Sequence, residues 1–150
     1  SISKGFYKGV KKSGFGIILG TPKKQMPSWV ENLNITILDT TKNSDYFNVL
    51  KSLDILVTYY DKNRYFYRAS GVISDAGSSG CYIIAPDYPL IRHQITWPVS
   101  IGQTFSHLDE IEDLLNQAFD HIKTYGQDNQ WLWRNKRDAQ YIAQLFNNLL

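Results

Sequence analysis

A turn of small residues leads into a short helical stretch at residues 70–86, SGVISDAGSSGCYIIAP. Ser70 and Gly71 begin the expected helix, and Gly80 is a residue that commonly ends one. The first N–H groups of a helix lack intrahelical partners and carry the positive end of the helix dipole. The N–H groups of Ser70, Gly71 and Val72 could therefore bind an anion, and phosphate is the usual one. The same pattern is also typical of a helix that only connects two strands, because a single such turn is weakly specific.

Charged side chains near this turn are further candidates. Asp75 lies one turn into the expected helix, where a carboxylate either stabilises the helix start, by about 0.3–1 kcal/mol, or accepts hydroxyl groups of a ligand. Arg64 and Arg68 stand in the preceding loop and could contact a phosphate, with solvated loop positions as an equal alternative. Thr40 follows an apolar run and is expected at the same edge of a sheet.

The sequence contains no motif for metal binding, hydrolysis or nucleophilic catalysis. His93, His107 and His121 are widely separated and lack metal-binding spacing. No acid pair for hydrolysis, no nucleophile elbow and no phosphate-loop lysine motif occurs. The single Cys81 cannot form an internal disulfide, and its apolar surroundings predict a buried thiol in a reducing compartment. We therefore expect neither a metal nor a cofactor.

The composition fits one folded domain. The chain has 150 residues, of which 43% are hydrophobic and 20% charged, which excludes a disordered chain. A net charge of +2 is too small to indicate nucleic acid as a partner. The first thirty residues contain six lysines and no acid, which predicts a solvated basic edge or, alternatively, a contact with phosphate or a membrane surface. With no apolar run of 18 residues, we expect a soluble cytoplasmic domain, with a peripheral membrane contact as the alternative.

Apolar runs alternate with helical patterns along the chain. Near-continuous apolar runs at residues 15–19, 35–38, 55–58 and 82–85 are typical of parallel strands buried on both faces. A fifth strand is predicted within residues 99–105. Short crossover helices are expected at 27–33, 46–53 and 71–79. This order predicts an α/β domain with a Rossmann-like, doubly wound parallel sheet, in which the first four strands are adjacent.

Two longer helices are expected to close the chain, at residues 108–122 and 131–150. Ser106 and Asp109 have the spacing of a capping box, and Gly126 would end the first of these helices. Trp97, Trp131 and Trp133 could form a hydrophobic surface, although aromatic residues are more often part of the core. Trp131 and Trp133, at the start of the second helix, are expected to lie partly exposed.

The run from Asp54 to Ala85 resembles the donor-binding, C-terminal half of GT-B retaining glycosyltransferases, group 1 or family 4-like, which use nucleotide sugars. The likeness is specific in this run and looser elsewhere, from Lys4 to about Tyr141. The matching positions are Asp54, Tyr60, Ser70, Gly71, Val72, Ala76, Gly80 and Ile83 to Ala85.

The resemblance implies roles for individual residues. Asp75 takes the position of a glutamate that accepts ribose hydroxyls, and is one methylene shorter. Tyr67 falls where a second glutamate contacts the transferred sugar, and a phenol cannot accept hydrogen bonds as a carboxylate does. Lys4 with Gly5 resembles the pair whose lysine contacts the donor diphosphate, so Lys4 is a candidate catalytic cation. Arg68, in the loop before the turn, is the second candidate catalytic cation. The donor site would comprise Thr40, Arg64, Tyr67, Ser70, Gly71, Val72 and Asp75.

The resemblance also implies what the chain belongs to. Residues 1–150 would be one donor-binding domain of a two-domain enzyme that transfers a sugar to a glycan, lipid or other acceptor. Its first strand and its acceptor-binding N-terminal domain would precede this sequence. An epimerase or phosphorylase of the same architecture is one alternative. A catalytically inactive domain for nucleotide-sugar binding or scaffolding is the other, and the departures at Tyr67 and Asp75 favour it.

Overall fold

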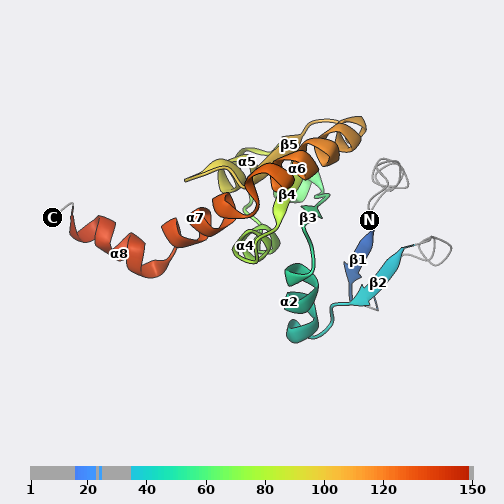
Figure 1. Ribbon diagram of the computed structural model, residues 1–150, viewed down its shortest axis with the longest axis horizontal. Helices are drawn as coiled ribbons and strands as arrows, with labels where there is room; N and C mark the ends of the chain where they lie inside the picture. The colour runs from blue at the N-terminus through green and yellow to red at the C-terminus, as the bar shows by residue number, and fades with distance from the viewer. Residues whose placement is uncertain (1–15, 23, 25–34, 149–150) are drawn as a thin grey trace.

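The chain is an α/β protein, and the strand pairings among the residues that the structure describes are all parallel (Figure 1). The structure is a computed structural model, and it describes residues 16–22, 24 and 35–148. The elements in chain order are β1 (Ile18–Thr21), β2 (Thr36–Asp39), α2 (Asn43–Lys51), β3 (Ile55–Val57), α3 (Lys62–Tyr65), α4 (Gly71–Ser78), β4 (Tyr82–Pro86), α5 (Pro89–Thr96), β5 (Gly102–Phe105), a 3-10 turn (Leu108–Glu110), α6 (Ile111–Tyr125), α7 (Asp128–Lys136) and α8 (Ala139–Asn147).

The strands of the described part of the chain form two sheets. β1 pairs with β2, and β3, β4 and β5 form a three-stranded sheet in that order. The prediction that the first four strands are adjacent in one sheet is therefore wrong, because no backbone ladder joins β2 or β1 to β3 within the described residues. The predicted α/β class and parallel pairing are confirmed. A helix at residues 27–33 lies outside the described residues.

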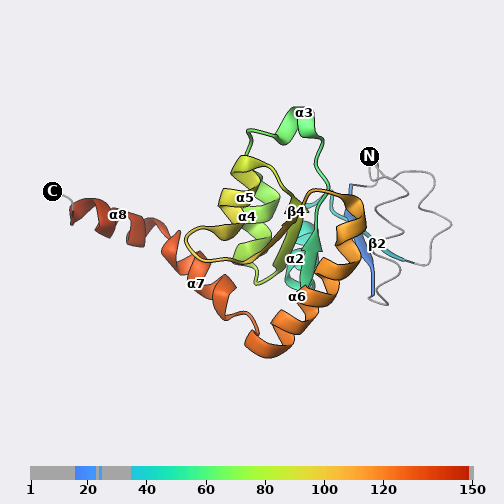
Figure 2. The ribbon, with the colours of Figure 1, turned by 90° about the horizontal axis from the view of Figure 1, so that it is seen from above.

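Helices cover both faces of the three-stranded sheet, as Figure 2 shows for α4 and α5 on one side and α6 on the other. Alternation along β4 explains this, since successive side chains of a strand point to opposite faces. Ile83 and Ala85 pack in one buried cluster with residues of α4, α5 and α7. Tyr82 and Ile84 pack in a second cluster with Ile111 and other residues of α6. All five residues of β4 are buried, as predicted for a central parallel strand.

Helix α2 connects the two sheets. It packs against β2 and also against α4. Val49 lies near β1, since a Cβ added to Gly20 would be 3.4 Å from its Cγ1. Leu50 belongs instead to the core of the three-stranded sheet. One helix thus contributes to the packing of both sheets.

The predicted helix ends are partly confirmed. Gly80 has φ +99°, and the N–H of Cys81 bonds to the carbonyl of Ala76 at 3.0 Å, as in a Schellman motif that ends α4. Gly126, with φ +59°, ends α6. The capping box lies one residue later than predicted: Glu110, not Asp109, accepts from the N–H groups of Ser106 and His107, because the first turn begins at Leu108.

The C-terminal part differs from the single helix expected at 131–150. It divides into α7 and α8 because Asp138 begins a new helix, accepting from the N–H of Gln140 at 2.8 Å. Trp133 is only 2% exposed and joins the core, so the prediction of an exposed surface is wrong there, whereas Trp131 is 44% exposed. Figures 1 and 2 show α8 leading away from the sheets. Of the helices described, none combines the length and apolarity needed to cross a bilayer.

Candidate anion site at the start of helix α4

Ser70 is the residue that begins α4. Its backbone is extended, with φ −113° and ψ 125°, and its Oγ accepts from the N–H of Ile73 at 3.4 Å. The hydroxyl of Tyr60 lies 2.6 Å from the same Oγ. The side chain of Ser70 is thus held by an N-cap bond and by a tyrosine from the loop after β3, which fixes the direction in which α4 starts.

Gln94 of α5 binds the backbone of Ser70 on both sides. The N–H of Ser70 donates to Oε1 of Gln94 at 2.9 Å, and Nε2 of Gln94 donates to the carbonyl of Ser70 at 2.7 Å and to Oγ of Ser74 at 2.7 Å. Ser70 is 4% exposed. The expectation that its N–H faces an open site is therefore wrong, because Gln94 already accepts that hydrogen bond.

Gly71 and Val72 retain open N–H groups. They are the first two residues of α4, both are exposed, and no acceptor among the described residues pairs with either N–H. The dipole of the eight-residue helix adds partial positive charge there. Gly71 has no atom within 4 Å of where a Cβ would stand, so the approach to its backbone is unobstructed. These two groups are the anion donors that the structure offers.

The start of α5 at the same sheet edge is less suited to an anion. Pro89, its first residue, has no N–H to donate. Asp87 precedes it and pairs with Arg92 while accepting from Oγ1 of Thr104 at 3.1 Å. The hydrogen bonds from Arg92 hold the pKa of Asp87 below its ordinary value, so this carboxylate stays charged near the helix start. The negative charge of Asp87 would therefore disfavour a phosphate at the start of α5.

Aromatic side chains surround the start of α4. They come from the loop between β3 and α4 and from the end of β4, which is the carboxyl edge where parallel α/β sheets bind ligands. The rings of Tyr60 and Tyr65 stack with centroids 4.4 Å apart. The hydroxyl of Tyr88 donates to the carbonyl of Tyr60 at 2.9 Å. Tyr88 therefore joins this loop to the carboxyl end of β4, and the Tyr60–Tyr65 stack adds packing within the loop.

Two of the predicted residues lie directly before Ser70. Tyr67 is 78% exposed, with its ring edge-on to Phe66 at 4.7 Å. The guanidinium of Arg68 lies over the ring of Tyr65 at 5.7 Å. Both side chains are near the open N–H groups in sequence and are accessible to a ligand.

Arg64 lies farther back, in α3. Its backbone N–H donates to the carboxylate of Asp61 at 3.2 Å, and its side chain is exposed. Lys62, one turn before Phe66, places its ammonium 5.5 Å from that ring. The loop thus carries three cations, at 62, 64 and 68, on its exposed side. Lys4 lies outside the described residues.

Asp75 faces α2 rather than the open end of α4. Its Oδ2 accepts from the hydroxyl of Tyr46 at 2.9 Å. Burial, together with the hydrogen bond to Asp75 and its charge, raises the pKa of Tyr46 above its ordinary value, so Tyr46 stays protonated as the donor. We expected this carboxylate to point into the same opening as the helix N–H groups. The described contact is instead a hydrogen bond between two helices, and its Oδ1 accepts none from the described residues.

Thr40 belongs to the other sheet. It follows β2, and its N–H donates to the carbonyl of Thr21 at 3.2 Å. Its Cγ2 would lie 3.2 Å from a Cβ added to Gly20, so it packs at the end of β1. Within the described residues, no hydrogen bond brings Thr40 to the start of α4.

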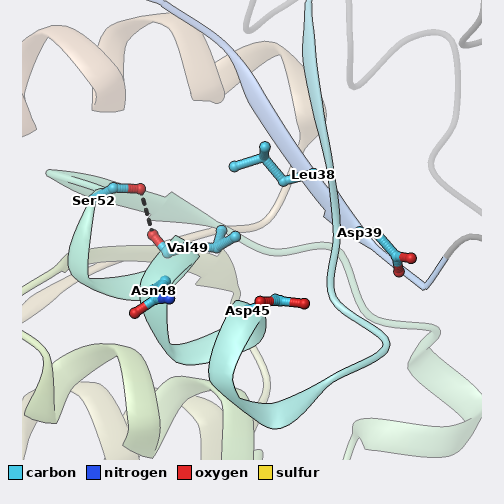
Figure 3. A pocket seen from close by; sticks show the side chains of 6 residues that line it. All are labelled: Leu38, Asp39, Asp45, Asn48, Val49 and Ser52. Atoms are coloured by element: carbon cyan, nitrogen blue, oxygen red, sulfur yellow. Dashed lines mark hydrogen bonds between the residues drawn. The ribbon is translucent and has the colours of Figure 1, made fainter.

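A pocket of about 280 Å³ opens between β2 and α2 (Figure 3). Two carboxylates line it, and Thr41 donates to one of them, Asp39, through both its N–H and its hydroxyl. Two acids make this pocket unfavourable for phosphate. Its lining residues are Leu38, Asp39, Asp45, Asn48, Val49 and Ser52.

Sequence reasoning missed Gln94, Tyr46 and Tyr60 as residues that shape this region. Their partners lie 10 to 29 residues away in the chain, and no local pattern marks them. The only available signal was chemical: a glutamine in the apolar stretch of α5 and tyrosines with hydroxyls that need partners when buried. In the part of the chain that is described, no group of three or more His, Cys, Asp or Glu residues could hold a metal ion.

Comparison of this chain with protein-family models, with curated proteins and with solved structures found no match in any of the three.

Proposed function

We propose that this chain is the nucleotide-sugar-binding domain of a glycosyltransferase, and that the start of α4 binds the donor diphosphate. The observation that supports this most is the pair of open N–H groups on Gly71 and Val72, at the carboxyl edge of a parallel sheet. The resemblance of residues 54–85 to the donor-binding half of GT-B enzymes is the second support.

Charge explains why this chemistry suits the site. Transfer of the sugar breaks the bond between its anomeric carbon and the diphosphate oxygen, so negative charge grows on the departing diphosphate. Fixed N–H donors and a helix dipole stabilise that charge without a metal. Arg68 and Arg64 would add positive charge from the loop before α4, and Lys4 would do so from the start of the chain.

The remaining contacts are assigned by position along α4 and its loop. Asp75 would accept the ribose hydroxyls, which requires a ribose to share or replace the hydroxyl of Tyr46. Tyr67 would lie beside the transferred sugar, where its exposed ring could stack on a sugar face. Thr40 would contact the donor only if the carboxyl edges of the two sheets meet at one site.

The acceptor, a glycan or lipid, would bind to a second domain, and the reaction would take place in the cytoplasm, with the lysine-rich start of the chain as a contact for a membrane surface. Residues 1–150 alone should therefore bind donor and transfer nothing. An epimerase or phosphorylase reaction on the same architecture would show itself in the products of the longer protein. Robust sugar transfer by residues 1–150 alone would contradict the two-domain proposal.

A catalytically inactive nucleotide-binding domain is the second candidate, because an exposed phenol, Tyr67, stands where the resemblance implies a carboxylate. Such a domain would bind the nucleotide equally well. Restoring the carboxylate with Tyr67→Glu in the longer protein separates the candidates: a gain of transfer favours an inactive domain, and a loss favours a tyrosine that serves the reaction.

Titration of ¹⁵N-labelled protein with UDP, GDP and ADP tests the proposal. We expect the amide resonances of Gly71 and Val72 to shift at millimolar ligand, with the base deciding which nucleotide shifts them most. The amide of Gln140, at the start of α8, is already bound by Asp138 and serves as the control. A folded protein in which no nucleotide moves Gly71 or Val72 would contradict the proposed site.

A further inference from the structure

Helix α8 has an apolar side that is largely open to solvent. Tyr141, Ile142, Leu145 and Phe146 lie three to five residues apart in two pairs and so share one side of the helix. No residue of α8 is buried, and Phe146 is 66% exposed. Figures 1 and 2 both show α8 leading away from the sheets. A flat surface could therefore meet this side of α8 without obstruction by the sheets.

Three cations lie at the junction of α7 and α8, namely Arg134, Lys136 and Arg137. In the part of the chain that the structure describes, no acid forms an ion pair with any of the three. The acid that follows them, Asp138, accepts from the N–H of Gln140 as the N-cap of α8. Helix α8 itself contains no charged residue. The junction thus carries net positive charge directly beside an uncharged apolar helix.

Two exposed tryptophans lie beside these cations. The guanidinium of Arg134 is 5.8 Å from the ring centroid of Trp131, and that of Arg137 is 6.0 Å from the ring centroid of Trp97, which follows α5. Trp97 is 50% exposed. Tryptophan is enriched where membrane lipid meets water, because its ring is apolar and its N–H is polar. Exposed indoles with cations over their rings are therefore suited to that boundary.

We propose that α8, together with its junction to α7, is an interfacial anchor that binds a membrane surface containing anionic phospholipids. The apolar side of α8 would enter the boundary between headgroups and acyl chains, and the cations of the junction would contact lipid phosphates. A helix that lies in the plane of the interface does not need the length of one that crosses the bilayer. The inference depends neither on the proposed function nor on the lysine-rich start of the chain.

The size and charge of α8 favour a lipid surface over a second copy of the chain. Nine residues of helix are about 13.5 Å long. Two copies paired through α8 alone would therefore bury less than the roughly 1,200 Å² at which stable specific interfaces begin. Because α8 contains no acid, a second α8 would also leave the cations of the junction unpaired. An anionic bilayer supplies both an apolar interior and negative charge.

Co-sedimentation with lipid vesicles tests the proposal. We expect the protein to bind vesicles of equal parts phosphatidylcholine and phosphatidylglycerol at least about tenfold more tightly than vesicles of phosphatidylcholine alone. Leu145→Ser combined with Phe146→Ser should weaken binding to the anionic vesicles by at least about tenfold, because the apolar side of α8 is lost. Phe47→Ser combined with Tyr125→Ser removes two exposed aromatic residues from α2 and α6 and is the matched control, which should bind like the unchanged protein.

A second pair of variants tests the charge. Arg134→Gln combined with Lys136→Gln should weaken binding to the anionic vesicles by at least about tenfold. Lys51→Gln combined with Lys123→Gln makes the same change of net charge at exposed positions of α2 and α6, and we expect a loss below about threefold. Circular dichroism and the urea midpoint should match the unchanged protein in the α8 variant, since no residue of α8 is buried.

Several results would overturn the proposal. They include no binding to either vesicle, equal binding to both, and an equal loss of binding in each variant and its control. Loss of binding when Lys8, Lys11 and Lys12 are replaced by Gln, with normal binding by the α8 variant, would assign the membrane contact to the start of the chain. A dimer in sedimentation equilibrium that Phe146→Ser abolishes, without vesicle binding by the unchanged protein, would assign α8 to a second copy.

Discussion

The side chain of Gln94 and the backbone of Ser70 form a reciprocal pair of hydrogen bonds, of 2.9 Å to Oε1 and 2.7 Å from Nε2. The carbonyl of Gln94 in turn accepts from Nε1 of Trp133 at 3.1 Å and from Nη1 of Arg137 at 3.3 Å. One residue of α5 thus holds the start of α4 and the end of α7. Gly71 and Val72, whose N–H groups are open, are the two residues that directly follow Ser70 in the chain.

Gln94→Met should destabilise the fold. The substitution keeps the volume but leaves the buried N–H of Ser70 unpaired, at a cost of about 1–3 kcal/mol. The carbonyl of Ser70 loses one hydrogen bond and keeps the one from the N–H of Ser74. Urea denaturation measures the loss of unfolding free energy. Gln140→Met, at an exposed position of α8, is the matched control and should change it by less than about 0.5 kcal/mol. Equal stability of the two variants would mean that the reciprocal bonds contribute nothing net.

Local patterns predicted most of the strands and several helix ends because their causes are local. Continuous apolar runs mark β3 and β4, and the positive φ that Gly80 and Gly126 adopt is a property of single residues. The unexpected break before α8 also had a local signal in Asp138, an N-cap residue, which the apolar spacing of residues 131–150 obscured.

The division into two sheets had no local signal. Strand pairing depends on which edges meet in space, and the runs that form β2 and β3 look alike in sequence. The same reason hid the Asp75–Tyr46 bond, whose partners are 29 residues apart. The indole N–H of the buried Trp133 donates to the carbonyl of Gln94, and that contact spans 39 residues. The geometry of the site depends on contacts between residues that are distant in the sequence. Its first residue, Ser70, could be predicted because serine is a common N-cap residue.

Gly102→Ala should prevent stable folding. Gly102 pairs with Ile83 in the ladder of β4 and β5, and an added Cβ would lie 2.0 Å from the carbonyl oxygen of Ile83. Backbone cannot yield to this contact as a flexible side chain would, so we expect a loss of more than about 3 kcal/mol. Gly71→Ala, where nothing lies within 4 Å, is the control for a glycine without this constraint. Near-native circular dichroism and stability for Gly102→Ala would show that the β4–β5 approach is looser than described.

Stability should fall as the pH rises above about 9. Burial raises the pKa of the Cys81 thiol from an ordinary value of 9.0 to about 12, and its Sγ donates to the carbonyls of Leu50 and Leu53. The thiol is protonated in both states below pH 9, so its contribution is then complete. Above pH 9 the unfolded thiol ionises first, which favours unfolding until the folded thiol ionises near pH 12.

The measurement is the unfolding free energy between pH 8 and 10, before most tyrosines ionise. The slope for one proton approaches about 1.4 kcal/mol per pH unit. Cys81→Ala should flatten the curve, and Asn116→Ala, an exposed change on α6, should not. A flat curve for the unchanged protein would mean that Cys81 titrates alike in both states.

Asp75→Asn should weaken the binding of a nucleotide sugar. If the carboxylate accepts ribose hydroxyls, the loss of a charged acceptor costs about 1–3 kcal/mol, measured by isothermal titration calorimetry. Tyr46→Phe removes the partner of Asp75 but keeps the carboxylate, so donor affinity should be unchanged or higher. If Asp75→Asn binds donor like the unchanged protein, the role of Asp75 is limited to joining α4 to α2.

The most direct test of the diphosphate site compares Gly71→Pro with Gly71→Ala. Proline is favoured at the first position of a helix, and the extended backbone of Ser70 suits a residue before proline, so α4 should persist while one N–H is lost. Alanine keeps that N–H. We predict that the proline variant loses about tenfold in affinity for a nucleoside diphosphate, as expected for one hydrogen bond to a charged group, while the alanine variant keeps it. Equal affinities in the two folded variants would contradict a diphosphate at the start of α4.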